Sequence, residues 1–297
     1  MHIPNVKAFT LISRGKTTSR KTYIILALVL AVYMLLAVFQ PGGLMAYIFP
    51  SACWSLLALT TIWIGGPQKI LQWFSKRVSI LAAIIAVIQI LILIDAGLFT
   101  GFGKSPYSFT PLGIIINIIY VYTALLGTEL TRAYLIKNFS REKPILTIGI
   151  ITLLYTFILT PVTRLTALVN PTTATLFLGS TLLPLAAENL LASYLAFLGG
   201  PLAALAYRAP LKAFYWFSPI LPDFPWYAEA LIGIVAPAVG FLIITFTTIN
   251  STKHTNTQKP VNPKQYENWQ KQKNKASRKI GKTLTGLFLS ILIALSI

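Results

Sequence analysis

The sequence has few charged residues and almost none of the residues that bind metals or form disulfides. Only 11% of its 297 residues are charged, and only seven are acidic. It contains one cysteine, Cys53, and two widely separated histidines, His2 and His254. This pattern excludes an internal disulfide and the usual zinc clusters. The sequence also lacks G-x-S-x-G, H-E-x-x-H, Walker lysine and Cys-x-x-Cys motifs, so it indicates no cofactor and no complete catalytic constellation.

Long apolar blocks dominate what is present. Hydrophobic residues make up 55% of the chain, and the mean hydropathy is +0.71. The blocks lack the polar face that a soluble helix needs, and several reach the roughly 20 residues that cross a bilayer as a helix. The sequence therefore predicts an all-α fold, a polytopic transmembrane helix bundle. The predicted spans are 23–39, 44–64, 78–100, 111–131, 144–160 and 229–249, with 172–207 long enough for two short ones.

The order of polar and apolar stretches divides the chain into four segments. Residues 1–22 are predicted to form a basic cytoplasmic tail, and residues 23–249 the transmembrane bundle. Residues 250–282 are predicted to be a basic cytoplasmic linker, and residues 283–297 the start of a further transmembrane helix. We therefore expect about eight spans up to residue 249 and a truncated ninth.

The excess of positive charge predicts the orientation. A net charge of +18 would suggest nucleic-acid binding in a soluble protein, but here the basic residues cluster between apolar blocks, as membrane orientation requires. If 172–207 is a helical hairpin or a re-entrant pair, 21 of the 25 Lys and Arg residues fall on the cytoplasmic side. The four left outside are Lys104, Arg164, Arg208 and Lys212. We expect a multi-pass protein of the cell membrane with a cytoplasmic N-terminus, an outward-directed chain end and no nucleic-acid partner.

The linker 250–282 is the only long hydrophilic stretch between apolar blocks. Six of its basic residues lie just before the last apolar run: Lys271, Lys273, Lys275, Arg278, Lys279 and Lys282. Such a stretch sets topology and contacts anionic lipid headgroups, which makes the lipid bilayer the expected partner here. An arm that docks protein or nucleic acid is the weaker alternative.

Glu129 and Arg132 form the first candidate polar site. Ionisable groups within membrane spans are costly, so each is a functional candidate. These two residues are three positions apart at the inner end of a predicted span and therefore share a helix face. The spacing favours an intrahelical pair that anchors the helix end, with a functional role as the alternative.

Glu188 and Asn189 form the second candidate. They follow Pro184, between the two apolar stretches of the predicted hairpin. Because proline donates no backbone hydrogen bond, Glu188 or Asn189 could satisfy groups freed at a helix break. The other interpretation is a proton or substrate group, with Arg164 and Arg208 as its candidate partners.

Three stretches together carry a resemblance to a known family: Glu129–Leu135, Ser193–Pro201 and Phe217–Trp226. They resemble the long membrane-embedded N-terminal region of archaeal and clostridial-type members of the signal peptidase I family. The resemblance implies a basic linker, one further helix and an extracytoplasmic catalytic domain, with secretory preproteins as partners. It also implies that the nucleophilic serine and its lysine or histidine base lie beyond residue 297. No catalytic residue can therefore be assigned to this chain.

Two functions from different classes follow from the sequence. The first is the membrane region of a signal-peptidase-like serine endopeptidase, which processes signal peptides in secretion, truncated before its catalytic domain. The alternative is a transporter or permease-like protein with Glu188, Arg164 and Arg208 lining a site near the membrane midplane. A structural subunit that binds other membrane proteins is a third possibility.

Overall fold

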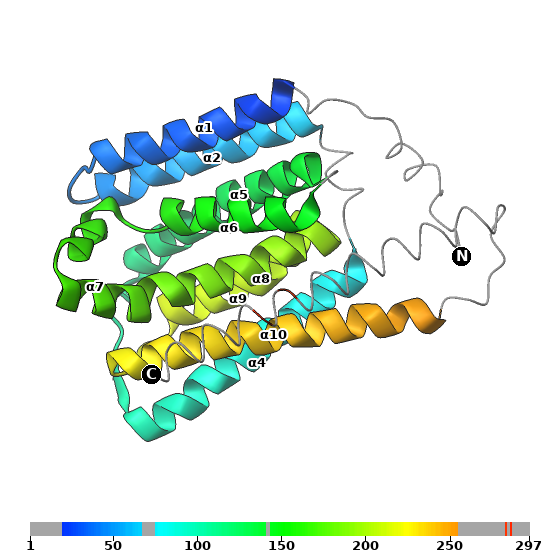
Figure 1. Cartoon of the computed structure of the whole chain (residues 1–297). Coiled ribbons are helices and arrows are strands. Elements are labelled where there is room, and N and C mark those ends of the chain that lie inside the picture. The colour runs from blue at the N-terminus through cyan, green and yellow to red at the C-terminus, as the bar shows by residue number, and fades with distance from the viewer. Residues whose placement is uncertain (1–19, 67–74, 141–142, 255–282, 284–285, 287–297) are drawn as a thin grey trace, which may run out of the picture.

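The computed structural model describes residues 20–66, 75–140 and 143–254, together with Thr283 and Gly286 (Figure 1). The tail up to residue 19, most of the basic linker and most of the last apolar run lie outside the described residues. The predictions made for those segments therefore stay predictions.

The first half of the described chain consists of five long apolar helices: α1 (Arg20–Val38), α2 (Met45–Gly65), α4 (Lys76–Thr100), α5 (Pro111–Phe139) and α6 (Pro144–Ile158). Two of them begin with proline, whose missing N–H would have no partner in a first turn. The Thr110 side chain caps α5 by accepting a hydrogen bond from the Gly113 N–H.

The second half begins with irregular helix. A 3-10 helix, η3 (Val162–Val169), follows α6 at an angle of 96°. Then α7 (Pro171–Phe177), a π-helical turn η4 (Leu178–Leu182) and α8 (Leu183–Gly199) form one continuous helical run.

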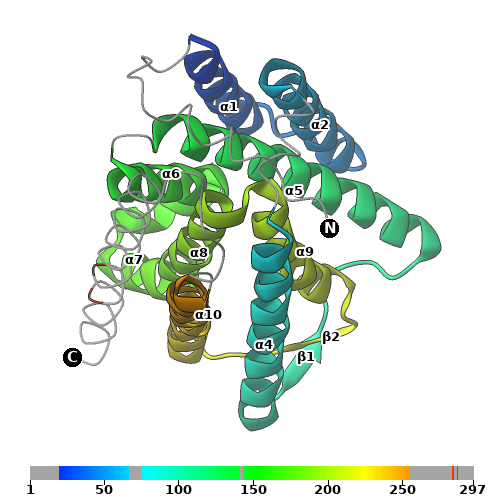
Figure 2. The same ribbon diagram turned by 90° about the vertical axis from the view of Figure 1, so that its right-hand side faces the viewer.

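The chain then turns back through two more helices. The turn at Gly200 leads into α9 (Pro201–Phe217), and α10 (Trp226–His254) completes the bundle. A short two-stranded ribbon joins the α4–α5 connection to the α9–α10 connection. In this ribbon β1 (Phe102–Lys104) pairs antiparallel with β2 (Ile220–Pro222), as Figure 2 shows.

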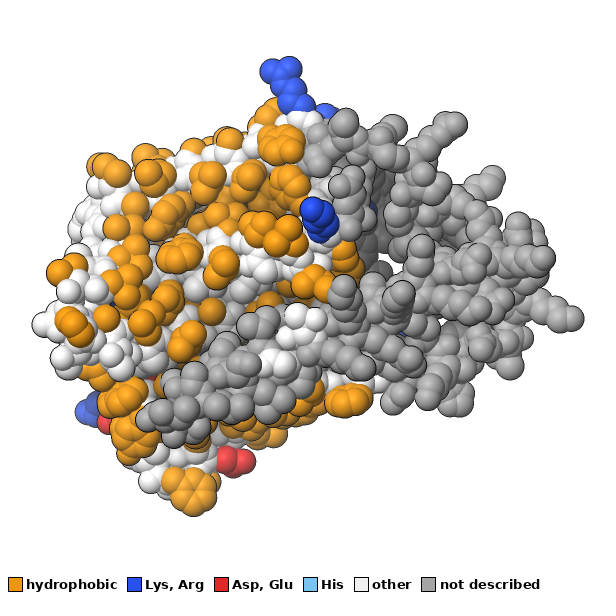
Figure 3. Space-filling view, viewed as in Figure 1, with side chains coloured by type: hydrophobic (Ala, Val, Ile, Leu, Met, Phe, Trp, Pro, Cys, Tyr) orange, Lys and Arg blue, Asp and Glu red, His pale blue; other side chains and the backbone are white. Residues whose placement is uncertain are grey.

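The helices have the length and surface of a membrane protein, which confirms the predicted all-α multi-pass bundle. Large apolar side chains face outward, including Trp63 at 83% and Phe99 at 91% exposure. Few charged side chains are visible among the hydrophobic ones in Figure 3. Six described segments can span a membrane: Arg20–Val38, Met45–Gly65, Lys76–Thr100, Pro111–Phe139, Pro171–Gly199 and Trp226–Thr247. If the bent pair of α6 and η3 is counted as one span, the number of candidate spans rises to seven. The predicted total of eight would require α9 to cross the membrane as well, and it stays a prediction.

The hairpin predicted at 172–207 turns at a different place from the one expected. Its break was expected near Pro184, but the helix continues through that residue because Leu183 donates its N–H to the Leu178 carbonyl in the π turn. The chain reverses instead at Gly200, whose φ of 75° suits glycine. The hairpin is therefore α7–α8 followed by α9, and α9 reaches Phe217.

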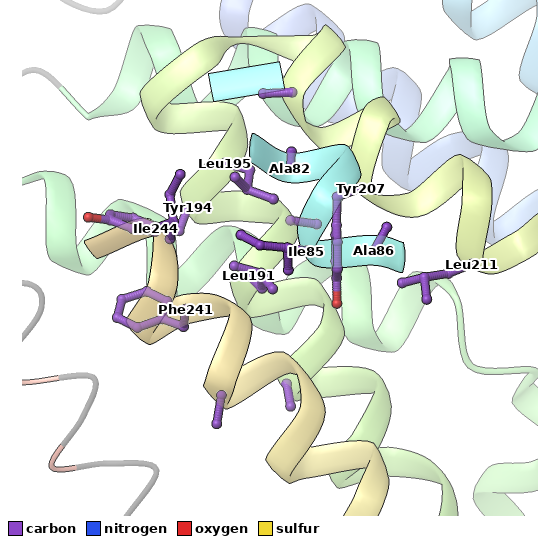
Figure 4. Packing of buried hydrophobic residues seen from close by; sticks show 14 of the residues in the cluster. Ala82, Ile85, Ala86, Leu191, Tyr194, Leu195, Tyr207, Leu211, Phe241 and Ile244 are labelled. Carbon is purple, nitrogen blue, oxygen red and sulfur yellow. The ribbon is translucent and has the colours of Figure 1, made fainter. Parts of the chain in front are cut away.

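Apolar packing holds α4, α8, α9 and α10 together. Figure 4 shows Ile85 of α4 near Leu191 of α8, with Phe241 of α10 in the same cluster. Small residues allow this approach: a Cβ built on Gly240 would lie 2.5 Å from the Ile85 Cγ2. The interior is therefore closely packed around α8, and the charged residues described next lie within it.

Candidate functional site: a buried ionic network

Four charged side chains from three helices meet inside the bundle. Arg132 and Glu129 of α5 form an ion pair with Nε and Oε2 3.0 Å apart, although these atoms lack the alignment of a hydrogen bond. Arg208 of α9 donates from Nη1 to Glu129 Oε1 at 2.9 Å and from Nε to Glu188 Oε1 of α8 at 3.0 Å. We call these four residues, together with Asn189, the ionic network.

The ionic network is almost fully buried and balanced in charge. Glu129 and Arg132 are 0% exposed and Arg208 is 1% exposed, whereas the Glu188 side chain is 15% exposed. Two carboxylates therefore face two guanidinium groups. Removing an ion from water costs several kcal/mol unless it is paired and hydrogen-bonded. The pairing makes these charges tolerable in an apolar bundle, and Glu188 marks the side where the network is least enclosed.

The two terminal nitrogens of Arg132 both donate hydrogen bonds to α8, whereas Nε only faces Glu129. Its Nη1 donates to the Asn189 carbonyl at 3.0 Å and to the Ser193 Oγ at 3.1 Å, and its Nη2 donates to Asn189 Oδ1 at 2.6 Å. Its guanidinium also lies 4.5 Å from the centre of the Tyr155 ring, close enough for a cation–π contact. A residue held by so many partners acts as a fixed connection between α5, α6 and α8.

Asn189, like Arg132, contacts several helices at once. Its Oδ1 accepts from Arg132 and also from Arg208 Nη1 at 3.4 Å, while its Nδ2 donates to Thr156 Oγ1 of α6 at 3.4 Å. One amide thus joins both arginines to a fourth helix. Because Asn189 and Ser193 are four residues apart in α8, both face α5.

The structure brings together five of the six residues predicted as candidate polar sites. Glu129, Arg132, Glu188, Asn189 and Arg208 are all in the ionic network. Arg164 is not: it is exposed in η3, and its charge acts on Glu229 of α10. The proposed partnership of Arg164 with Glu188 is therefore wrong.

Three predictions about the residues that do belong to the ionic network need correction. The Glu129–Arg132 pair forms, but it does not anchor a helix end, because α5 continues to Phe139. Glu188 and Asn189 do not repair a helix break, because the helical run continues through Pro184 and their side chains bind arginines. Arg208 does not lie in an outer segment, because it is buried in α9.

Three residues that contact the ionic network were not predicted. Ser193 could have been found from its spacing to Asn189 on one helix face. Tyr155 and Thr156 come from α6, and nothing in their local sequence indicates that they approach Arg132 and Asn189. Among the described residues there is no group of three or more His, Cys, Asp or Glu side chains that could hold a metal ion.

Fold and ionic network together define a multi-pass helical membrane protein with a charged, interconnected interior. Comparison of the chain with models of protein families, with curated proteins and with solved structures found no match.

Tyr155 offers a graded test of the contacts around Arg132. Its hydroxyl hydrogen-bonds the Thr131 hydroxyl, and its ring faces Arg132. We expect Tyr155→Phe to lower the free energy of unfolding by about 1 kcal/mol, the worth of one hydrogen bond. Tyr155→Leu should cost about 1–2 kcal/mol more, because it also removes the ring from the guanidinium.

Unfolding of the purified protein in mixed micelles measures both effects. Tyr227→Phe is the matched control, because Tyr227 is 62% exposed on α10. Equal losses for Tyr155→Phe and Tyr155→Leu would contradict the contact between the ring and Arg132.

Proposed function

We propose that this chain is a membrane-embedded scaffold, the helical membrane region of a signal-peptidase-like protein that processes secretory preproteins. The observation that carries the scaffold is the engagement of Arg132, which is 0% exposed and bound to α5, α6 and α8 at once. A group that received a substrate would need to be accessible, and Arg132 is fully buried. A buried, charge-balanced network instead fixes the relative positions of the helices.

Two of the three stretches that carry the resemblance to the signal peptidase I family lie together in the structure. Glu129–Leu135 and Ser193–Pro201 contact each other through the hydrogen bond from Arg132 to Ser193. The third stretch, Phe217–Trp226, contains β2 and leads into α10. The resemblance is therefore centred on the interior of the bundle and on one end of it.

Orientation in the cell membrane, with a cytoplasmic N-terminus, is part of the same proposal. Arg132 and Arg208 are buried inside the bundle and are not loop residues. Without them, the charge count leaves Lys104, Arg164 and Lys212 as the basic residues of the outer segments. The asymmetry that the positive-inside rule requires becomes stronger, and the basic linker remains a candidate for contact with anionic lipid.

Cleavage of a secretory preprotein tests this function. The longest reading frame that contains the chain should encode a Ser-x-Ser-Met-like motif, and its membrane-inserted product should remove the signal peptide. Residues 1–297 alone should cleave nothing. A full-length product without that motif, or cleavage by residues 1–297, would contradict the proposal.

Glu188 is the least enclosed residue of the ionic network, and this favours a second candidate function. In that function the chain is a carrier whose polar site lies beside Glu188. The scaffold predicts no flux of ions or small solutes through proteoliposomes. A carrier predicts flux that Glu188→Gln reduces at least tenfold, because the variant removes the least enclosed carboxylate of the ionic network. Asp95→Asn is the control, since Asp95 is an exposed acid on α4. Flux that Glu188→Gln reduces and Asp95→Asn leaves intact would replace the scaffold with the carrier.

A further inference from the structure

Lys212 adds a fifth charge next to the ionic network. It lies on α9 four residues after Arg208, so the two side chains share a helix face. Glu188 lies twelve residues before Gly200 and Lys212 twelve residues after it, which puts them at the same level of the α8–α9 hairpin. The charges that act on Lys212 among the described residues are those of Glu188, Arg208 and Glu129.

The charges at this level do not balance. Glu129 and Glu188 supply two negative charges, whereas Arg132, Arg208 and Lys212 supply three positive ones. Both carboxylates already bind an arginine within 3.0 Å. In the part of the chain that the structure describes, Lys212 makes no hydrogen bond and no direct ion pair, although it is half-buried and Glu188 is the charge that acts on it most strongly. One positive charge is thus left over in a region where an unpaired ion is costly.

The position of Lys212 suggests which anion can reach it. Lys212 is in the last turns of α9, which ends at Phe217 next to β2. A lysine near a helix end extends its ammonium toward the membrane–water interface. The phosphate groups of lipid headgroups and phosphate ions in solution are multiply charged or hydrogen-bonding anions that reach this interface.

We propose that Lys212, beside Arg208, binds a phosphate group at the end of the α8–α9 hairpin opposite Gly200. The phosphate belongs to an anionic lipid headgroup or to a free phosphate anion. Its negative charge offsets the positive charge that the two carboxylates leave unpaired. This inference rests on the charges of the ionic network and Lys212, and it holds for a scaffold and for a carrier alike.

Thermal unfolding of the purified chain in a neutral detergent tests the site. One arm adds inorganic phosphate against chloride at constant ionic strength, and the other adds phosphatidylglycerol against phosphatidylcholine. We expect a rise in Tm of about 3 °C in at least one arm, the response of a site filled well above its dissociation constant. A rise with phosphatidylglycerol only identifies the lipid headgroup as the source, and a rise with inorganic phosphate identifies the free anion.

Three variants separate this site from general charge effects. Lys212→Gln should fold, because Lys212 has no ion pair in the described part of the chain, and it should lose the rise. Lys104→Gln, which removes an exposed lysine on β1, should keep it. Glu188→Gln should enlarge the rise, because it leaves more positive charge around the anion. No rise in either arm, a rise that survives Lys212→Gln, or a loss in Lys104→Gln would overturn the proposal.

Discussion

Glu129→Gln is expected to destabilise the bundle by about 3–5 kcal/mol, the usual cost of removing one partner from a buried ion pair. Glu129 is 0% exposed and contacts Arg132 Nε at 3.0 Å and Arg208 Nη1 at 2.9 Å. The substitution keeps the shape of the side chain and removes only its charge. It would leave two buried guanidinium groups with Glu188 as the one remaining carboxylate of the ionic network. The loss should be visible as reduced stability in mixed-micelle unfolding and as aggregation on size-exclusion chromatography.

Asp95→Asn is the matched control, because it removes the same charge from an exposed position on α4. Its stability should stay within about 0.5 kcal/mol of the unmodified protein, as for most surface substitutions. The double variant Glu129→Gln, Arg132→Met should recover part of the loss, because it leaves Arg208 and Glu188 as a balanced pair. Equal stabilities of Glu129→Gln and Asp95→Asn would show that the network does not hold the bundle together.

Gly127→Leu is expected to cost about 2–3 kcal/mol by forcing α2 and α5 apart. A Cβ built on Gly127 would lie 2.8 Å from the backbone carbonyl oxygen of Trp54 and 3.1 Å from the Trp54 Cβ. The carbonyl oxygen belongs to the backbone of α2, so the clash cannot be relieved by a rotamer change. Small residues at such contacts allow membrane helices to pack closely without a hydrophobic driving force.

Gly149→Leu supplies the comparison, because nothing lies within 4 Å of a Cβ built on Gly149 of α6. Leucine has a higher helix propensity than glycine by several tenths of a kcal/mol, so this variant should be neutral or slightly stabilised. Unfolding measured under the same conditions compares the two. A Gly127→Leu protein as stable as Gly149→Leu would contradict the close packing of α2 on α5.

Hydropathy alone predicted the helices well, for a physical reason. A helix that crosses the bilayer needs about 20 apolar residues. The first and last residues of an apolar block therefore predict where the helix begins and ends. The predicted spans 23–39, 78–100 and 229–249 correspond to α1, α4 and α10 within a few residues. Exceptions occur where a helix extends past the apolar block, as α5 does by continuing to Phe139.

The turn of the α8–α9 hairpin could not be located in this way. Proline and glycine both suggest a break, and the sequence offers Pro184 and the Gly199–Pro201 step. Pro184 is tolerated because it lies in the first turn of α8, directly after the π turn. Gly200 has a positive φ that reverses the chain. Only the packing of α8 against α9 and α10 decides between these two residues.

Only the contact between residues close in sequence could be predicted in the ionic network. The spacing of Glu129 and Arg132 predicts their pair, because helix geometry alone brings them together. Arg208 was assigned to an outer segment because a charge count treats basic residues as loop residues. Its burial depends on carboxylates from α5 and α8, which are 79 and 20 residues away in sequence. Contacts of that kind follow from the fold and not from local pattern.

The central claim is that an ionic network joins α5, α8 and α9 inside the membrane bundle. A double-mutant cycle between Glu129→Gln and Arg208→Gln, measured by unfolding in mixed micelles, tests it most directly, because these residues meet across two helices at 2.9 Å. A coupling free energy above about 1 kcal/mol is expected for charges in contact. Additive effects, with a coupling below about 0.3 kcal/mol, would contradict the claim.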